Sequence, residues 1–211
     1  MAREKSPAQT RFDDIIKSAV TSVLKPLGFR KSALNFHRRH NDVVQVVNFQ
    51  SSHSSSWDKK LFYINVGLAF DAVCQLASIE ILEKPKEYEC DSRGTRERLE
   101  RLLDNVPARW VVRANEDSSP VAEHLNSAIE QLAKDLESID GLQAYRTHRW
   151  FNQFRPKPVN AQILYILGDL DGSWNEVTQL CEHFADRQAI NQPKRWIEEL
   201  GLTKLAAKCC P

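Results

Sequence analysis

The side chains best suited to chemistry interrupt two neighbouring apolar segments. Asn48 and Gln50 lie in VVQVVNFQ, and Tyr63 and Asn65 lie in LFYINVGLAF. Amide and phenol groups both donate and accept hydrogen bonds, so these four residues could line a polar groove for a peptide or a small molecule. The pattern favours the alternative, in which two opposed asparagines satisfy each other's buried polar atoms and the pair is architecture.

A second candidate is a group of basic side chains that could form a patch for an acidic partner. Its members are Arg93, Arg96, Arg98 and Arg101, with the run His37, Arg38, Arg39 and His40. Arginine presents a planar fork that suits carboxylates and phosphates. We also predict a helix over residues 95–105, with Glu97 and Arg101 in an i,i+4 pair. Arginines on a short surface helix are usually solvated and paired with glutamates, which favours the plainer interpretation.

The third candidate is the segment YRTHRWFNQFRPKP, residues 145–158. Its arginines alternate with Trp150, Phe151 and Phe154, which could stack on bases while the arginines contact phosphates. The alternative is an amphipathic helix whose aromatic residues pack inward and whose arginine stems cover the edge. The net charge of only +1 favours the second interpretation.

Three apparent motifs fail on their spacing. GDLDGSWNE places its glycine at the fourth position of a calcium loop instead of the sixth. Cys181 and His183 lack two further zinc ligands, and His53 has neither a nucleophile elbow nor an orienting acid. We therefore expect no metal site, no cofactor and no catalytic residue that a motif would reveal.

Composition bounds the class of protein. The chain has 211 residues, 42% hydrophobic and 27% charged, which is ordinary for a globular protein with an ample core. Its amino terminus is charged, and no apolar run approaches the roughly 18 residues that span a bilayer. The five cysteines form no CxxC pair, which is typical of reduced, mostly buried thiols. We expect a cytoplasmic protein that does not enter a membrane.

The hydrophobic pattern predicts a helix over residues 7–25 and strands over 29–38, 42–51 and 61–70. A hairpin must place the apolar residues of the last two strands on one face, because a slip of one residue would invert every side chain. The predicted register therefore sets Asn48 opposite Asn65 and Gln50 opposite Tyr63.

The rest of the chain is predicted to be mainly helical. EKPKEYECD could add an edge strand, residues 108–114 resemble another strand, and only helices follow residue 119. The fold class is α+β: an N-terminal helix packed on an antiparallel sheet of about 4–5 strands, followed by an all-helical C-terminal half. Residues 1–115 carry 19 Lys and Arg against 14 Asp and Glu, and residues 116–211 carry 10 against 14. We accordingly predict an α+β domain over 1–115 and a helical extension over 116–211.

The stretch from Gly28 to Phe70 resembles the bacterial family built on the domain of unknown function numbered 4304. The features that carry the resemblance are Gly28, Phe29, Phe36, Arg38, Val46, Asn48, Gln50, Phe62, Asn65 and Gly67, and less tightly Glu89, Cys90, Arg93, Arg96, Arg98 and Trp110. The likeness covers about the first half of the chain. It implies a small bacterial cytoplasmic α+β protein and no particular activity.

Three classes of function remain open. The first, which we favour, is a non-enzymatic protein-interaction module, whose specific form would be an immunity protein that binds and neutralises a cognate toxin. The second is a nucleic-acid or phosphoryl-ligand binder, in which Arg96 and Arg98 would share a face with Arg38 or Arg149. The third is an enzyme without a recognisable motif, which would hold a perturbed side chain in a deep pocket, for instance near His37 or Cys90.

Overall fold

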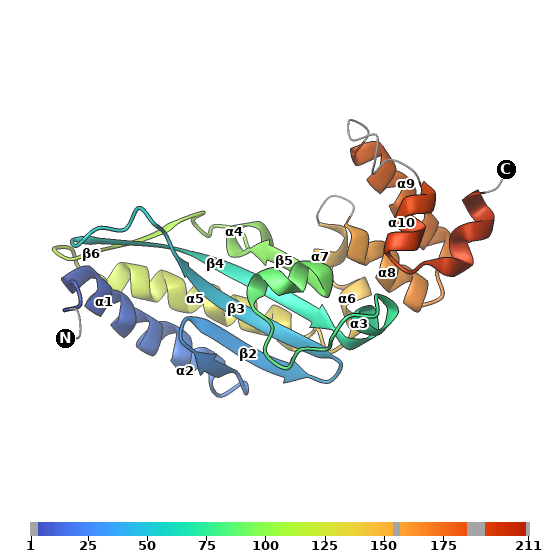
Figure 1. The fold of residues 1–211 in the computed structure, drawn as a ribbon. Helices are drawn as coiled ribbons and strands as arrows, with labels where there is room; N and C mark the ends of the chain where they lie inside the picture. Colours follow the sequence, from blue (N-terminus) through green and yellow to red (C-terminus); the bar gives the residue numbers. More distant parts are fainter. Residues whose placement is uncertain (1–3, 154–156, 185–192, 210–211) are drawn as a thin grey trace.

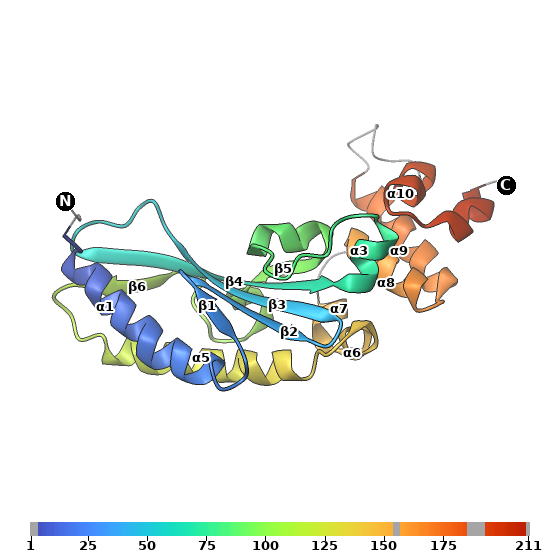
Figure 2. The same cartoon turned by 60° about the horizontal axis from the view of Figure 1, so that its bottom comes forward.

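The computed structural model describes residues 4–153, 157–184 and 193–209. It has the expected α+β architecture, with a twisted antiparallel sheet, helices against one of its faces and a helical C-terminal part at one end (Figures 1 and 2). The strands are β1 (Arg30–Ser32), β2 (Asn35–His40), β3 (Val43–Ser51), β4 (Lys59–Phe70), β5 (Gly94–Arg98) and β6 (Trp110–Arg113). They pair in the order β1-β2-β3-β4-β5, and β6 also pairs with β4.

The helices in chain order are α1 (Pro7–Ile15), the π-helical turn η1 (Ile16–Thr21), α2 (Ser22–Leu24), α3 (Asp71–Leu76), the 3-10 helix η2 (Glu87–Ser92), α4 (Leu99–Leu102), α5 (Ser119–Glu137), α6 (Leu142–Thr147), α7 (Arg149–Asn152), α8 (Pro158–Ile166), α9 (Leu170–His183), α10 (Pro193–Glu199) and the 3-10 helix η3 (Thr203–Cys209). The predicted first helix is confirmed. Ser6 caps it by accepting a hydrogen bond from the Gln9 amide, and Pro7 occupies the first turn.

The main core lies between the sheet and the helices α1 and α5, which run side by side beneath it (Figure 2). Alternate residues of β4 face these helices and are buried, namely Phe62, Ile64, Val66, Leu68 and Phe70. The intervening residues therefore project from the opposite face, as expected for a strand with a period of two. The predicted register is confirmed, since Val47 pairs with Val66 and Phe49 with Ile64.

The helix η2 covers part of the opposite face of the sheet. Cys90 lies in a small buried cluster with Val44, Val46 and Ala69, so η2 packs directly on β3 and β4. A Cβ atom at Gly67 would lie 2.7 Å from Cys90 Sγ, so the missing side chain is what allows this close approach. The edge strand predicted in EKPKEYECD was wrong: its C-terminal part forms η2, which packs on the face of the sheet.

Two further elements differ from the sequence-based prediction. The strand expected over 29–38 is divided by a turn at Ala33, whose φ is +53°, into the hairpin of β1 and β2. The helix expected over 95–105 is instead β5 followed by the single turn α4. Gly94 allows this, because a Cβ there would lie 2.1 Å from the Leu68 carbonyl oxygen, and the backbone pairing with β4 outweighs the local helix propensity.

The main core crosses the boundary that we predicted between residues 115 and 116. Helix α5 and parts of α6, α7 and α8 contribute to the same cluster as the sheet. A second, smaller core joins α8, α9, α10 and η3 through residues such as Val177 and Leu202. The division of the chain into two domains stays a prediction. The buried side chains of α8 are shared between the two cores: Val159, Ile163 and Leu164 belong to the main core and Ala161 to the smaller one.

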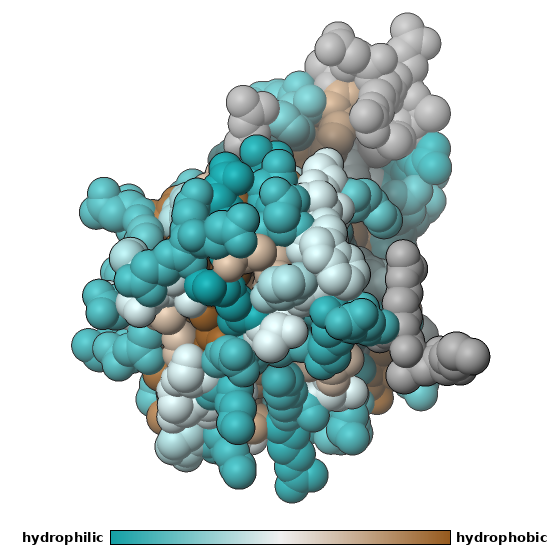
Figure 3. All heavy atoms as spheres, turned by 90° about the vertical axis from the view of Figure 1, so that its left-hand side faces the viewer, coloured by the Kyte–Doolittle hydropathy of each residue, from teal (hydrophilic) through white to brown (hydrophobic). Residues whose placement is uncertain are grey.

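The end of the molecule that carries the start of α1 and the connection between β3 and β4 is mainly hydrophilic (Figure 3). Hydrophobic residues show there only as small patches between polar ones.

Candidate functional site

A row of polar residues crosses five adjacent strands on the open face of the sheet. Directly opposed pairs link Ser32 to Asn35, Asn35 to Asn48, Asn48 to Asn65 and Asn65 to Arg98. The predicted pairing of the two asparagines is thus confirmed, and the same register extends the row to both edges of the sheet. Asn35 was not singled out from the sequence, because it becomes a neighbour of Asn48 only when β2 pairs with β3.

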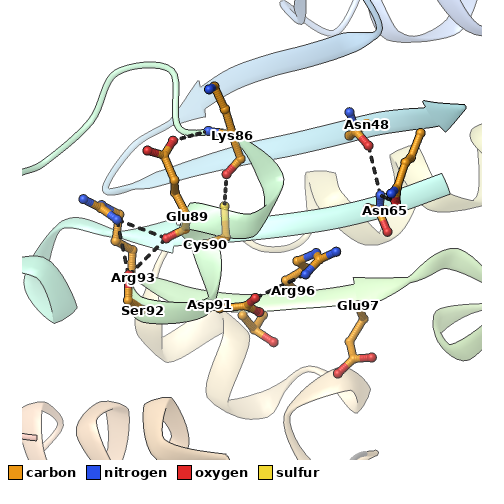
Figure 4. Close-up of polar contacts among 12 residues, drawn as sticks. Asn48, Asn65, Lys86, Glu89, Cys90, Asp91, Ser92, Arg93, Arg96 and Glu97 are labelled. Atoms are coloured by element: carbon orange, nitrogen blue, oxygen red, sulfur yellow. Dashed lines mark hydrogen bonds and ion pairs between the residues drawn. The ribbon is translucent and has the colours of Figure 1, made fainter. Parts of the chain in front are cut away.

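The amides in this row form one hydrogen-bonded chain. Asn65 Nδ2 donates to Asn48 Oδ1 at 2.9 Å (Figure 4). Asn48 Nδ2 donates to Asn35 Oδ1 at 2.8 Å, and Asn65 Nδ2 also donates to Gln50 Oε1 at 3.2 Å. Asn65 is only 1% exposed and Asn48 is 9% exposed. The architectural interpretation of the pair therefore accounts for most of its polar atoms.

Two buried atoms at the end of the row are left without a partner. Among the described residues no hydrogen-bonding group reaches Asn65 Oδ1 or Arg98 Nη1. The Arg98 guanidinium lies over the Tyr63 ring, 4.3 Å from its centroid, and Tyr63 in turn is paired with Gln50. A shallow groove of about 250 Å³ opens here, lined by Asn65, Arg96, Glu97, Arg98 and Arg101. The amide row and the arginines therefore meet in one place.

The arginines of the predicted basic group have different surroundings. Arg96 and Arg98 alternate with Glu97 on β5 and project from the open face, where Arg96 pairs with Asp91 at 3.3 Å (Figure 4). Arg101 pairs with Glu97 at 3.5 Å, as the i,i+4 spacing predicted. Because the helix over 95–105 does not exist, strand alternation brings Arg96 and Arg98 to one side.

Arg93 serves the fold. Its guanidinium donates to the carbonyl oxygens of Glu80 and Glu89, both at 3.2 Å, and so connects η2 to the segment that precedes it. It does not line the groove beside Asn65.

The basic run on β2 is divided between the two faces of the sheet. Arg38 is 7% exposed and lies on the helix side, where it donates to Gln45 Oε1, to the Leu27 carbonyl and to Glu137 at 2.7 Å. Gln45 Nε2 donates in turn to the carbonyl oxygens at the end of α5. Arg38 therefore anchors the C-terminus of α5, and it does not share a face with Arg96 and Arg98.

His37 lies on the open face and is 9% exposed. Its Nε2 donates to the Pro85 carbonyl at 2.9 Å, which fastens the segment before η2 to the sheet. Burial lowers the pKa of His37, and the neighbouring Lys84 charge acts in the same direction. A neutral, hydrogen-bonded His37 is suited to a structural role.

The aromatic segment packs inward, as its plainer interpretation predicted. Trp150 and Phe151 are 2% exposed and belong to the main core. Arg149 donates to Asp135 at 2.6 Å and to the Leu102 carbonyl, so its charge is engaged by α5. Phe154 and its two successors lie outside the described residues.

The titratable groups near the sheet offer little for acid–base or nucleophilic work. Burial raises the pKa of Cys90 to about 12, so its thiol stays protonated and unreactive at neutral pH. The described residues contain no group of three or more His, Cys, Asp or Glu side chains that could hold a metal ion.

A family model, that of the domain of unknown function DUF4304, matches residues 20–153. The chain belongs to this family. The resemblance that we drew from the hairpin is thereby confirmed, and the DUF4304 match continues past residue 115 to the end of α7. It contains every strand of the sheet and every residue of the groove. No curated protein and no solved structure matches the chain.

Within the described part of this DUF4304 protein, no helix combines the length and the apolar character needed to cross a membrane.

Proposed function

We propose that the protein is a non-enzymatic interaction module that holds an acidic segment of a partner protein in the groove beside Asn65. Neutralisation of a cognate toxin is the specific form that we favour. The observation that carries the proposal is the pair of buried, unpartnered atoms Asn65 Oδ1 and Arg98 Nη1 at a groove that three arginines line.

These two atoms favour a peptide as the occupant. They leave one acceptor and one donor free, and a peptide unit offers one of each. A phosphate group offers acceptors, so it would satisfy Arg98 and leave Asn65 Oδ1 without a donor. An unsatisfied buried polar group costs about 1–3 kcal/mol, which a ligand that supplies both partners would recover.

The charges around the groove favour an acidic segment. The carboxylate of Glu97 is held by Lys157 and Arg101, and Asp91 is the only acidic partner of Arg96 among the described contacts. Arginine side chains are thus in excess over carboxylates. Their planar forks bind carboxylates in a bidentate manner, so Asp and Glu of a partner suit them.

The experiment compares capture by three versions of the tagged protein from its own cells, in the presence of nuclease. The groove variant carries Arg96→Glu and Arg98→Glu. The matched control carries Lys17→Glu and Lys25→Glu, which reverse two exposed charges on the helices that cover the other face of the sheet. Mass spectrometry identifies the partner, and calorimetry with the purified partner measures stoichiometry and affinity.

We expect one protein in a 1:1 complex with the wild type and the control, bound at least about tenfold more weakly by the groove variant. Equal binding by all three versions would place the interface elsewhere and overturn the assignment of the groove. An eluate whose ultraviolet absorbance indicates nucleic acid would favour the second class of function, whose hallmark is a steep loss of affinity with salt. Both variants must also keep the wild-type melting temperature within a few degrees.

A further inference from the structure

A second recess opens on the other side of η2 from the groove. It measures about 300 Å³ and lies between the hairpin of β1 and β2 and the segment that holds Glu83 and Lys84. The last pair between the two strands joins Arg30 to His37, so Arg38 and Arg39 continue beyond the end of β1. The recess is therefore built where β1 leaves the sheet, from one hairpin and from a segment that is distant in sequence.

The row that contains Arg30 and His37 shows how the two sites are separated. It continues through Val46 and Gly67 to Arg96, and η2 sits on its middle through Cys90. The recess occupies one end of this row and the arginine groove the other. A ligand in one therefore does not reach the other.

The recess is strongly basic. Five of its lining side chains are cationic and one is a carboxylate: Arg30, Lys31, Arg38, Arg39, Lys84 and Glu83. Arg38 is neutralised by Glu137, and Arg39 by Asp71 at 2.8 Å and by Glu83 at 3.2 Å. Arg38 and Arg39 thus already form ion pairs with Glu137, Asp71 and Glu83, the acidic groups in these contacts.

The other three cations have no carboxylate partner among the described residues. Lys31 lies over the Phe36 ring at 5.7 Å, and neither Arg30 nor Lys84 makes an ion pair or a side-chain hydrogen bond there. His37 holds Lys84 in place indirectly, because its bond to the Pro85 carbonyl fastens the residue next to Lys84. His37 is thus a positioning residue for this site.

We propose that this recess binds a small phosphorylated molecule. Arg30 shares the open face with His37, beside Lys84, and neither cation has a carboxylate partner among the described residues. The two suit the negative charge of a phosphate or pyrophosphate group, because Arg30 can donate from its fork while Lys84 acts as a point charge. The volume lies at the lower end of the range for small-molecule sites, which suits a compact ligand. The lining contains no Phe, Tyr or Trp side chain, so the charged group supplies most of the recognition.

The experiment titrates pyrophosphate into the full chain at low ionic strength and pH 7.5 and measures the heat of binding by calorimetry. The test variant carries Arg30→Ala and Lys84→Ala. One control carries Lys17→Ala and Lys25→Ala, and a second carries Arg96→Glu and Arg98→Glu to separate this recess from the groove. Amide chemical-shift changes in the labelled wild type locate the bound anion independently of any variant.

We expect saturable binding by the wild type and both controls, at least about tenfold weaker in the Arg30 and Lys84 variant, with shift changes centred on residues 28–39 and 83–85. Absence of saturable binding by the wild type, or binding unchanged in the test variant, would overturn the proposal. Citrate binding more tightly than pyrophosphate would overturn the choice of a phosphorylated ligand in favour of a carboxylate. The groove variant alters only the groove, so a negative result for this recess leaves the proposed function of the groove unaffected.

Discussion

Asn65 and Asn48 face each other across β3 and β4, and Asn65 Nδ2 donates to Asn48 Oδ1 at 2.9 Å. This bond is the centre of the amide chain that crosses the open face, and its far end is the unpartnered oxygen of Asn65. One residue therefore takes part in both the architecture and the proposed site: its amide nitrogen stabilises the sheet, and its oxygen is a buried acceptor without a partner among the described residues.

Asn48→Ala should lower the stability of the fold. It removes the buried acceptor of Asn65 and the partly buried donor to Asn35. The expected loss is about 1–3 kcal/mol in the free energy of unfolding, measured by urea denaturation. Gln50→Ala is the matched control, since Gln50 is exposed and should cost clearly less. If Asn48→Ala kept its stability but lost ligand binding, the structural role of the asparagine pair would be refuted and a binding role favoured.

Gly67→Ala should separate η2 from the sheet. The new Cβ would lie 2.7 Å from Cys90 Sγ, so one of the two elements must move. We expect a loss of about 1–3 kcal/mol, as for overpacked cores. Gly141→Ala is the control, because no atom lies within 4 Å of a Cβ built there. Adding Cys90→Ala to Gly67→Ala should restore part of the lost stability, and no recovery would show that the strain lies elsewhere.

Cys90 should resist alkylation as long as the protein is folded. Its pKa of about 12 leaves almost no thiolate at pH 8, and the side chain has no exposed surface. Peptide mapping after iodoacetamide treatment should show Cys90 labelled only in denaturant, whereas the half-buried Cys181 is labelled earlier. Equal rates for Cys90 in the folded and denatured chain would contradict the position of η2.

His37 should make the fold less stable at acidic pH. Burial lowers its pKa in the folded chain below the ordinary 6.5, so at and below about pH 6.5 the unfolded chain binds a proton that the folded chain does not. The stability is therefore full above pH 6.5 and is lost as the pH falls through the folded pKa. Urea denaturation at pH 7.5 and 5.5 measures the difference.

His37→Gln is the variant that tests this assignment, because glutamine can donate to the Pro85 carbonyl and does not titrate. The difference in unfolding free energy between pH 7.5 and 5.5 should be smaller in the variant than in the wild type. The same pH dependence in both proteins would assign the effect to other groups.

Much of the sheet could be predicted from local pattern. The alternation in residues 61–70 identifies β4, and the need to bury one face sets its register with β3, so the pairing of Asn48 with Asn65 followed from sequence. The first helix followed in the same way from the helical spacing of its apolar residues, and Ser6 and Pro7 lie at its start, where these residue types are favoured. These features depend on neighbours a few residues apart or on one hairpin, and such information is present in the chain itself.

Other features depended on contacts between distant segments. The helix expected over 95–105 became β5 because β4 offered an edge and Gly94 allowed close approach. We grouped Arg38 with the other arginines, but strand alternation directs it toward Gln45 and the end of α5. Neither outcome leaves a periodic signal in the sequence, since both depend on tertiary packing.

Sequence patterns and family likeness were enough to predict an α+β protein of the DUF4304 family with an amide pair in its sheet. Which basic residues meet could be learned only from the three-dimensional fold. It placed Arg96 and Arg98 beside Asn65, and it brought Lys84 to Arg30 across the first hairpin. The physical reason is that strand pairing and the docking of η2 set which side chains share a surface, and both are long-range interactions.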